Sequence, residues 1–173
     1  PIVALLSKKS RRPVKCVFTR DEEFTSSTIR HPFIMDYTTG VNDEGLILAR
    51  KIRLVLDGGA YCSWTGTTIG KGSILAPGPY NIENVFVEAY AVYTNKTTTG
   101  AMRGFGAPQV CFAYESQMDE IAHKLGIDPL EIRLKNGFSE NSLSPTSQTL
   151  QSVALKESLN QASDRFGWKE WKA

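Results

Sequence analysis

The chain has 173 residues, of which 41% are hydrophobic, and a formal net charge of +2. This length and composition suit one substantial domain that buries about 70% of the surface of its unfolded chain, and the small net charge gives no indication of a nucleic-acid partner. No apolar run approaches the roughly 20 residues that span a bilayer, so no membrane partner is expected.

The first segment, Pro1–Leu6, is apolar and begins without an initiator methionine. We therefore expect the chain to be a fragment of a longer protein. Three scattered cysteines, Cys16, Cys62 and Cys111, lack the close pairing of a zinc or iron–sulfur site. An odd number of cysteines without a disulfide framework indicates buried thiols and a cytoplasmic location.

The first half of the chain has the composition and alternation of β-strands. Strands are predicted over residues 14–20, 33–39, 46–57 and 84–93. The turn residues of segment 41–45 predict a hairpin between the second and third strands, and a break in alternation near Arg50 predicts a bulge. The glycine-rich stretch from Gly58 to Gly72 is predicted to be mostly loop, and strand 84–93 is expected to be buried on both faces for part of its length.

From Pro108 the apolar period changes to that of a helix, which Gly126 ends. Asp128 and Glu131 form a start signal for a second helix that runs to about Asn136. A polar linker over 139–150 and a last amphipathic helix within 151–173 complete the chain. Strands followed by helices predict an α+β fold, with an antiparallel or mixed sheet covered on one face by helices.

The loop Ala101–Gln109 combines one arginine with flexible glycines directly before the first long helix. Gly104 and Gly106 allow the backbone to approach a bound group closely, and Pro108 suits the first helical turn. A helix N-terminus behind such a loop favours an anion. The same Arg-Gly-aromatic-Gly pattern also occurs in ordinary turns and RNA-binding tails, so these residues alone leave the function open.

The order of motifs around this loop resembles the molybdenum-cofactor domain of the xanthine dehydrogenase and aldehyde oxidase family. The resemblance covers roughly residues 11–137 and rests on Arg12-Pro13-Val14-Lys15, Arg30-His31-Pro32-Phe33, Gly59-Ala60-Tyr61, Tyr80-Asn81-Ile82, Ala101–Gln109, Gly126-Ile127-Asp128-Pro129 and Glu131-Ile132-Arg133. We accordingly expect residues 1–138 to be part of the molybdenum-cofactor-binding domain, 139–150 a linker loop, and 151–173 a C-terminal helix of the same domain.

The resemblance also implies roles for individual residues. Met102, Arg103 and Gly104 would contact the cofactor, with Arg103 beside the metal, and Phe105 would stand against a flat substrate ring. Lys71 occupies the position where purine-oxidising members carry an arginine. Because lysine lacks the planar fork of arginine, either the substrate differs from xanthine or this segment aligns differently, and an exposed surface lysine is an equal alternative.

Two histidines and one glutamate complete the candidates. His31 and His123 are isolated and are not expected to bind a metal. Glu115 lies close to the apolar stripe of its helix, where an unpaired carboxylate would be costly. We expect Glu115 to pair structurally with an arginine or a backbone N–H.

The family resemblance implies a fragment of a molybdenum hydroxylase that oxidises a purine, another N-heterocycle or an aldehyde with water-derived oxygen. The cofactor would be molybdenum–molybdopterin, with iron–sulfur clusters and FAD on other domains or subunits of an oligomeric enzyme. No catalytic residue is expected in this fragment, which would be inactive alone. The alternatives are a noncatalytic scaffold paralogue, or an RNA-binding or interaction domain that uses Arg103–Gly106 and the basic run Lys8–Arg12.

Overall fold

The structure is a computed structural model that describes residues 1–172. Its helices are α1 (Ile2–Ser10), α2 (Arg20–Ser26), α3 (Thr65–Leu75), α4 (Ala107–Leu125), α5 (Pro129–Asn136), α6 (Leu155–Phe166) and α7 (Trp168–Lys172). Its strands are β1 (Ile29–Arg30), β2 (Phe33–Val41), β3 (Ile47–Asp57), β4 (Asn84–Val92) and β5 (Thr99–Gly100).

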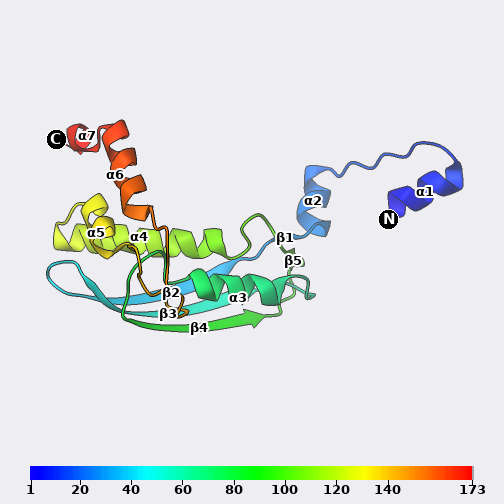
Figure 1. Cartoon of the computed structure of the whole chain (residues 1–173). Coiled ribbons are helices and arrows are strands. Elements are labelled where there is room, and N and C mark those ends of the chain that lie inside the picture. The colour runs from blue at the N-terminus through cyan, green and yellow to red at the C-terminus, as the bar shows by residue number, and fades with distance from the viewer. Residues whose placement is uncertain (173) are drawn as a thin grey trace.

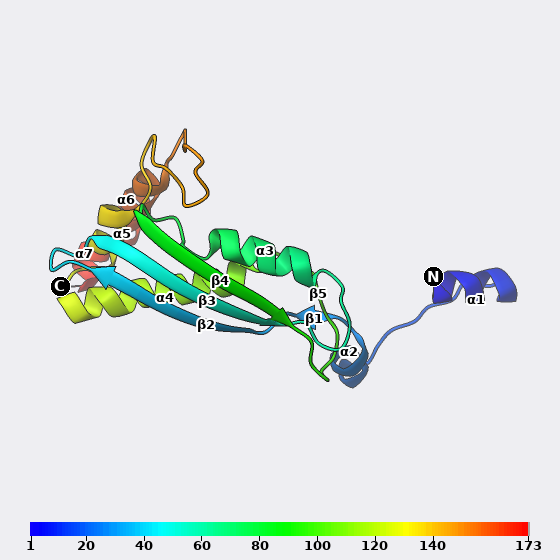
Figure 2. The same ribbon diagram turned by 90° about the horizontal axis from the view of Figure 1, so that it is seen from below.

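The main sheet has the strand order β2-β3-β4. β2 and β3 form the expected antiparallel hairpin, whereas β4 is parallel to β3 and is reached through α3. Helices α3 and α4 lie along one face of this sheet, and Figure 2 looks onto the opposite face, which no helix of residues 1–172 covers (Figures 1 and 2). The α+β class and the mixed sheet with helices on one face are thus confirmed.

A bulge interrupts the hairpin, but two residues before the predicted position. Ala49 pairs with Gly40 and Ile47 pairs with Val41, so Leu48 has no partner across the ladder. The extra residue changes which side chains face the helices. Beyond it Arg50, Ile52, Leu54 and Leu56 are buried under the helices.

The predicted strand over 14–20 is wrong. Residues 13–19 have no regular structure, and α2 begins at Arg20. Thr19 and Glu22 form a capping box, in which the Glu22 N–H donates to Thr19 Oγ1 at 3.2 Å and the Thr19 N–H donates to Glu22 Oε2 at 2.8 Å. Every residue from Lys15 to Ser26 is exposed, so alternation there reflects no buried face.

The loop predicted between Gly58 and Gly72 contains a full helix, α3. Glycines usually interrupt a helix, but Gly72 is buried where α3 meets β2 and α4. A Cβ added at Gly72 would lie 3.4 Å from the Phe33 ring and 3.8 Å from the Gly106 Cα. Tight packing at this one position therefore outweighs the low helix propensity of glycine.

Strand β4 exists as predicted, but it is not buried on both faces. It is an edge strand, and Phe86 and Tyr90 are 55% and 49% exposed. The cysteines also differ from expectation, since Cys16, Cys62 and Cys111 are all free and exposed rather than buried.

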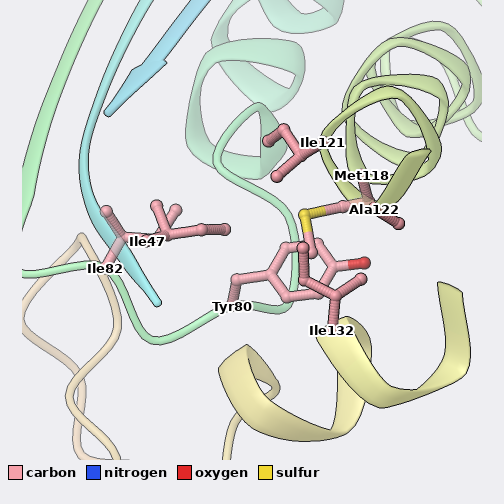
Figure 3. Packing of buried hydrophobic residues seen from close by; sticks show 7 residues of the cluster. All are labelled: Ile47, Tyr80, Ile82, Met118, Ile121, Ala122 and Ile132. Atoms are coloured by element: carbon pink, nitrogen blue, oxygen red, sulfur yellow. The ribbon is translucent and has the colours of Figure 1, made fainter. Parts of the chain in front are cut away.

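Two apolar clusters form the core between the sheet and the helices. One joins Ile52 and Leu54 of β3 to Ala76 and Val110. The other lies at the far end of α4 and contains Ile47, Tyr80, Ile82, Met118, Ile121, Ala122 and Ile132. Figure 3 shows the Tyr80 ring against Met118 and Ile132, with Ile47 and Ile82 approaching from the sheet side.

The predicted stop signal of α4 and the predicted start signal of α5 are both confirmed. Gly126 closes α4 in the left-handed conformation, and the Asp128 side chain caps α5 by accepting from the Leu130 N–H at 2.7 Å. Residues 139–154 form a loop with one bridge between Leu143 and Thr149. The single helix predicted at the end is divided into α6 and α7 at Gly167, whose φ is +71°.

Candidate functional site

The loop before α4 is a compact turn that depends on its glycines. The Phe105 N–H donates to Met102 O at 2.7 Å, and the Ala107 N–H donates to Gly104 O at 3.1 Å. Gly104 and Gly106 have φ values of +86° and +96°, which residues with a Cβ rarely adopt. The backbone of the predicted binding loop is therefore fixed by its own hydrogen bonds.

Gly106 makes its close approach to α3. A Cβ at this position would lie 2.5 Å from Thr68 O and 2.9 Å from the Gly72 N. The glycine thus lets α3 and α4 pack together, which corrects the expectation that it makes room for a ligand. The Gly106 N–H itself donates to Gln109 Oε1 at 3.2 Å, and Pro108 has no N–H to offer. The start of α4 consequently presents fewer free donors than expected.

A second segment supports the loop from the neighbouring strand. β1 pairs in parallel with β5, which leads into the loop, and places Arg30 opposite Gly100. The Arg30 Nη2 donates to Arg103 O at 3.0 Å. Gln109 Nε2 donates to His31 O at 3.1 Å, so both ends of the loop are anchored to consecutive residues.

The side chains at the tip of the loop are accessible to solvent. Met102 is 43% exposed and Arg103 is also exposed. Within residues 1–172, the Arg103 guanidinium takes part in none of the hydrogen bonds or ion pairs of the structure. Next to it, Arg30 Nη1 is buried and has no hydrogen-bond partner among the described residues. Two arginines therefore lie at one loop, and both have N–H donors without acceptors among residues 1–172.

Phe105 and Lys71, which are 34 positions apart in the sequence, meet in space. The Lys71 Nζ lies 4.6 Å from the centroid of the Phe105 ring, within the range of a cation–π contact. Both residues are half-buried. The structure therefore unites the two residues expected to contact substrate, and it places Lys71 on a helix rather than on the predicted loop.

The histidines have no metal partners in residues 1–172, where no group of three His, Cys, Asp or Glu side chains is placed to hold a metal ion. His31 is 2% exposed, and its Nε2 lies 3.1 Å from Thr65 Oγ1. Burial lowers the pKa of His31, although its contacts with Gly100 and Asp57 act in the opposite direction. His31 is a structural residue under the loop, and His123 is exposed.

Glu115 pairs with an arginine, as expected. Its Oε2 accepts from Arg133 Nε at 2.7 Å, and its Oε1 accepts from the Tyr80 hydroxyl at 2.8 Å. Burial and this bond to Glu115 raise the pKa of Tyr80. Burial would lower the pKa of Arg133, but bonds to Glu115 and Asp119 outweigh it and raise that pKa. These groups stabilise the junction of α4 and α5.

Sequence reasoning missed Arg30 as a site residue. The Arg30-His31-Pro32-Phe33 motif contributes to the family pattern, but the contact of Arg30 with Arg103 spans 73 positions and gives no local signal. Gln109 was missed for the same reason. Its bond to His31 spans 78 positions, and no local spacing encodes it.

Among residues 1–172, no helix combines the length and apolar character needed to cross a membrane.

Comparison with known proteins identifies a shared domain. The chain is 39% identical over 94% of its length to the nicotinate dehydrogenase large molybdopterin subunit of Eubacterium barkeri, and 37% identical over 100% to the xanthine dehydrogenase molybdenum-binding subunit of Escherichia coli. It spans 38% and 23% of the lengths of these two relatives.

A solved structure shares the same fold. The aldehyde oxidoreductase from Desulfovibrio gigas superimposes with a TM-score of 0.87 at 30% identity, covering 99% of this chain and 19% of that one. Residues 1–137 match the family described as the molybdopterin cofactor-binding domain. The chain belongs to the molybdopterin cofactor-binding domain family.

Proposed function

We propose that this chain is part of a xanthine dehydrogenase-like molybdenum hydroxylase that oxidises a purine, another N-heterocycle or an aldehyde with water-derived oxygen. Met102, Arg103 and Gly104 contact the cofactor in this proposal, with Arg103 at the metal. The observation that carries it is a loop, held by its own backbone hydrogen bonds, that exposes a guanidinium unpaired among residues 1–172. The names of the relatives, which concern nicotinate, xanthine and aldehyde oxidation, support it.

The residues at the loop fit an anionic group. Guanidinium groups suit phosphate and other oxyanions because their N–H donors form a planar fork. The buried Nη1 of Arg30 has no partner among residues 1–172, and an unmade hydrogen bond of a buried donor costs about 1–3 kcal/mol. An oxyanion of the cofactor would remove that cost, which is a reason to place the metal end of molybdopterin here.

The chain's own residues would orient the substrate. Phe105 offers one face of its ring to a planar heterocycle, a contact worth about 0.5–1.5 kcal/mol beyond burial. Lys71, held over the same ring, adds a positive charge beside the bound heterocycle. When bound, the cofactor supplies metal-assisted activation of water-derived oxygen and accepts electrons. No residue of this chain is assigned as a catalytic base, and the isolated chain should be inactive.

The remaining parts of the enzyme are proposed on the same basis. The relatives named as subunits support partner subunits or domains, to which we assign the iron–sulfur clusters and FAD of an oligomeric enzyme. We propose the division into residues 1–138, a linker over 139–150 and a C-terminal segment of the same domain over 151–173. Three free, exposed cysteines fit a reducing compartment, the cytoplasm.

Phe105→Ala in the full-length enzyme tests the substrate role. We expect kcat/KM for a planar N-heterocycle to fall about three- to tenfold, because the ring contact is lost. A small aliphatic aldehyde gains nothing from the ring, so its kcat/KM should change little. Phe112→Ala is the matched control, since Phe112 is 75% exposed on α4. An equal loss for both substrates would assign Phe105 to packing.

Lys71→Arg tests the cation above the ring. If Lys71 contacts substrate, the forked donor should raise turnover of oxygen-bearing purines up to about tenfold, because one well-placed donor contributes about 2.7–4 kcal/mol and the gain here is partial. Lys71→Met should lower the same turnover. The measurement is xanthine and hypoxanthine oxidation at matched molybdenum content. Identical rates for all three proteins would make Lys71 a structural partner of Phe105 alone.

A further inference from the structure

Arg30 differs from the other arginines of the chain because one nitrogen of its guanidinium donates a hydrogen bond while another is buried without a partner among residues 1–172. It lies on β1 and pairs with Gly100 of β5, and Gly100 precedes Arg103 by three residues. Its Nη2 donates to the carbonyl oxygen of Arg103 at 3.0 Å. This bond fixes the backbone of Arg103, whose own side chain is exposed.

The other end of the Arg30 fork is buried without an acceptor among residues 1–172. Nearby structure does not provide one. His31 Nε2 is engaged with Thr65, and the amide oxygen of Gln109 accepts from Gly106. Since a planar guanidinium cannot turn one nitrogen without moving the other, the bond to Arg103 also holds Nη1 in place. A buried donor that is held in this way, on an arginine that is itself half-buried, is suited to a ligand oxygen.

We propose that Arg30 is a positioning residue of the cofactor site that acts in two ways. It holds the Met102–Gly104 loop through the Arg103 carbonyl, and it donates from Nη1 to an oxyanion of the bound cofactor, either its phosphate or the oxygens at its metal end. This inference rests on the proposed function, because the cofactor supplies the acceptor. Arg30 and Arg103 then form a pair of cations on the same ligand, one behind the loop and one at its tip.

The experiment compares wild type, Arg30→Lys and Arg30→Gln in the full-length enzyme, with Arg53→Lys as control. Arg53 is exposed on β3 and pairs with Asp36 at 3.6 Å, away from the loop. Molybdenum per protein is measured by mass spectrometry, and pterin is measured by fluorescence after oxidative release. The half-time of cofactor loss on dilution and the unfolding temperature of cofactor-free protein are recorded for every variant.

We expect both Arg30 variants to lose cofactor about 10- to 100-fold faster than wild type, as is typical when a residue that supports a metal site is replaced. Arg30→Lys keeps the charge but cannot serve both acceptors, so it should not rescue retention. Cofactor-free Arg30→Lys should unfold within about 1 °C of wild type, a shift below the roughly 2–4 °C that a change of about 1 kcal/mol causes in a domain of 150–250 residues.

Loss of pterin together with molybdenum would assign the acceptor to the phosphate, and loss of molybdenum alone would assign it to the metal end. Wild-type retention in Arg30→Lys and Arg30→Gln would overturn the inference while leaving the proposed function intact. A cofactor-free protein that unfolds much earlier, with unchanged retention in its folded fraction, would likewise overturn it. A wild-type enzyme without molybdenum or pterin would refute the proposed function itself.

Discussion

Two ends of the molecule, one around Glu115 and one around Arg103, each contain two arginines. The ends differ in whether the guanidinium donors have acceptors within the chain. Arg133 donates to Glu115, Asp119 and the Pro129 carbonyl, and Arg50, which is 1% exposed, donates to Pro77 O at 2.7 Å. Every one of these charges has acceptors within the chain.

At the opposite end, some donors are left without acceptors in the described part of the chain. Arg30 uses one nitrogen and leaves another buried without a partner, and the exposed Arg103 guanidinium has no hydrogen-bond or ion-pair partner among residues 1–172. Because burying an unpaired donor is costly, folding alone gives no reason to keep Arg30 Nη1 in this position. The contrast supports the proposal that the Glu115 end of the domain serves stability and that the Arg103 end keeps hydrogen-bond donors for a ligand.

The largest effect that would test this comparison is expected at Arg133. Arg133→Ala leaves the Glu115 carboxylate with the Tyr80 hydroxyl as its remaining side-chain partner. We expect the free energy of local opening around α4 and α5 to fall by about 2–3 kcal/mol, because the partly buried Glu115 carboxylate, whose side chain is 33% exposed, loses its ion-pair partner. Hydrogen exchange of peptides from these helices in the full-length enzyme measures the change.

Arg103→Ala is the counterpart at the other end. It should change local opening by less than about 0.5 kcal/mol, as expected for an exposed side chain, while reducing molybdenum content. Arg53→Ala controls for loss of an exposed ion pair, which contributes about 0–1 kcal/mol. If Arg103→Ala destabilised its surroundings as much as Arg133→Ala does, the division between the two ends would fail.

A smaller effect is expected from two glycines near the site. Gly106→Ala forces a positive φ on alanine and drives its Cβ toward Thr68 O, so we expect a loss of about 2 kcal/mol in the protection of α3 and α4 amides. Gly66→Ala is the control. Nothing lies within 4 Å of a Cβ at Gly66, which is helical and exposed, so this change should stabilise α3 by about 0.5–1 kcal/mol. Equal responses at both positions would show that α3 and α4 do not depend on close contact.

The smallest effect concerns pH. Burial lowers the pKa of His31 below the value of about 6.5 expected in the unfolded chain. In the interval between those two pKa values the unfolded state binds more protons, so stability near the loop should be complete above about pH 6.5 and fall as the pH drops further. Hydrogen exchange of β1 and α3 peptides between about pH 7.5 and 5.5 should show this slope.

His31→Gln should flatten that slope, because the substituted side chain does not titrate. Asp57 and the other carboxylates with a lowered pKa stabilise the fold fully above about pH 4, and this contribution is lost only at lower pH. They therefore do not contribute to the slope in this window. An unchanged slope in His31→Gln would exclude His31 as its source.

These two ends also differ in how far the sequence predicts them. The α4–α5 end follows local rules, since Gly126 ends one helix, Asp128 caps the next, and Glu115 needs a partner wherever it is buried. Local rules would also have found α2, because Thr19 and Glu22 carry the spacing of a capping box. The erroneous strand over 14–20 came from alternation without a pairing partner.

The loop end depends on contacts that no local rule contains. Gly72 is acceptable in a helix because Phe33 and Gly106 pack against it, and neither is near it in sequence. The contact between Lys71 and Phe105, and the bond from Arg30 to Arg103, arise only once α3 lies beside α4. Family resemblance could name the residues of this end, but the geometry that joins them is tertiary.

The parallel pairing of β3 with β4 has a consequence for the order of folding. The β2–β3 hairpin closes over a short turn, whereas β4 can join β3 only after the crossover through α3, and β1 and β5 must meet across about 70 residues. Contacts between distant residues form late because loop closure costs entropy first. The three glycines of α3 make an early, isolated helix unfavourable. We therefore expect the Arg103 loop to be the last part to acquire its shape, so that during synthesis the proposed cofactor-contacting end forms only after the rest of the domain is in place.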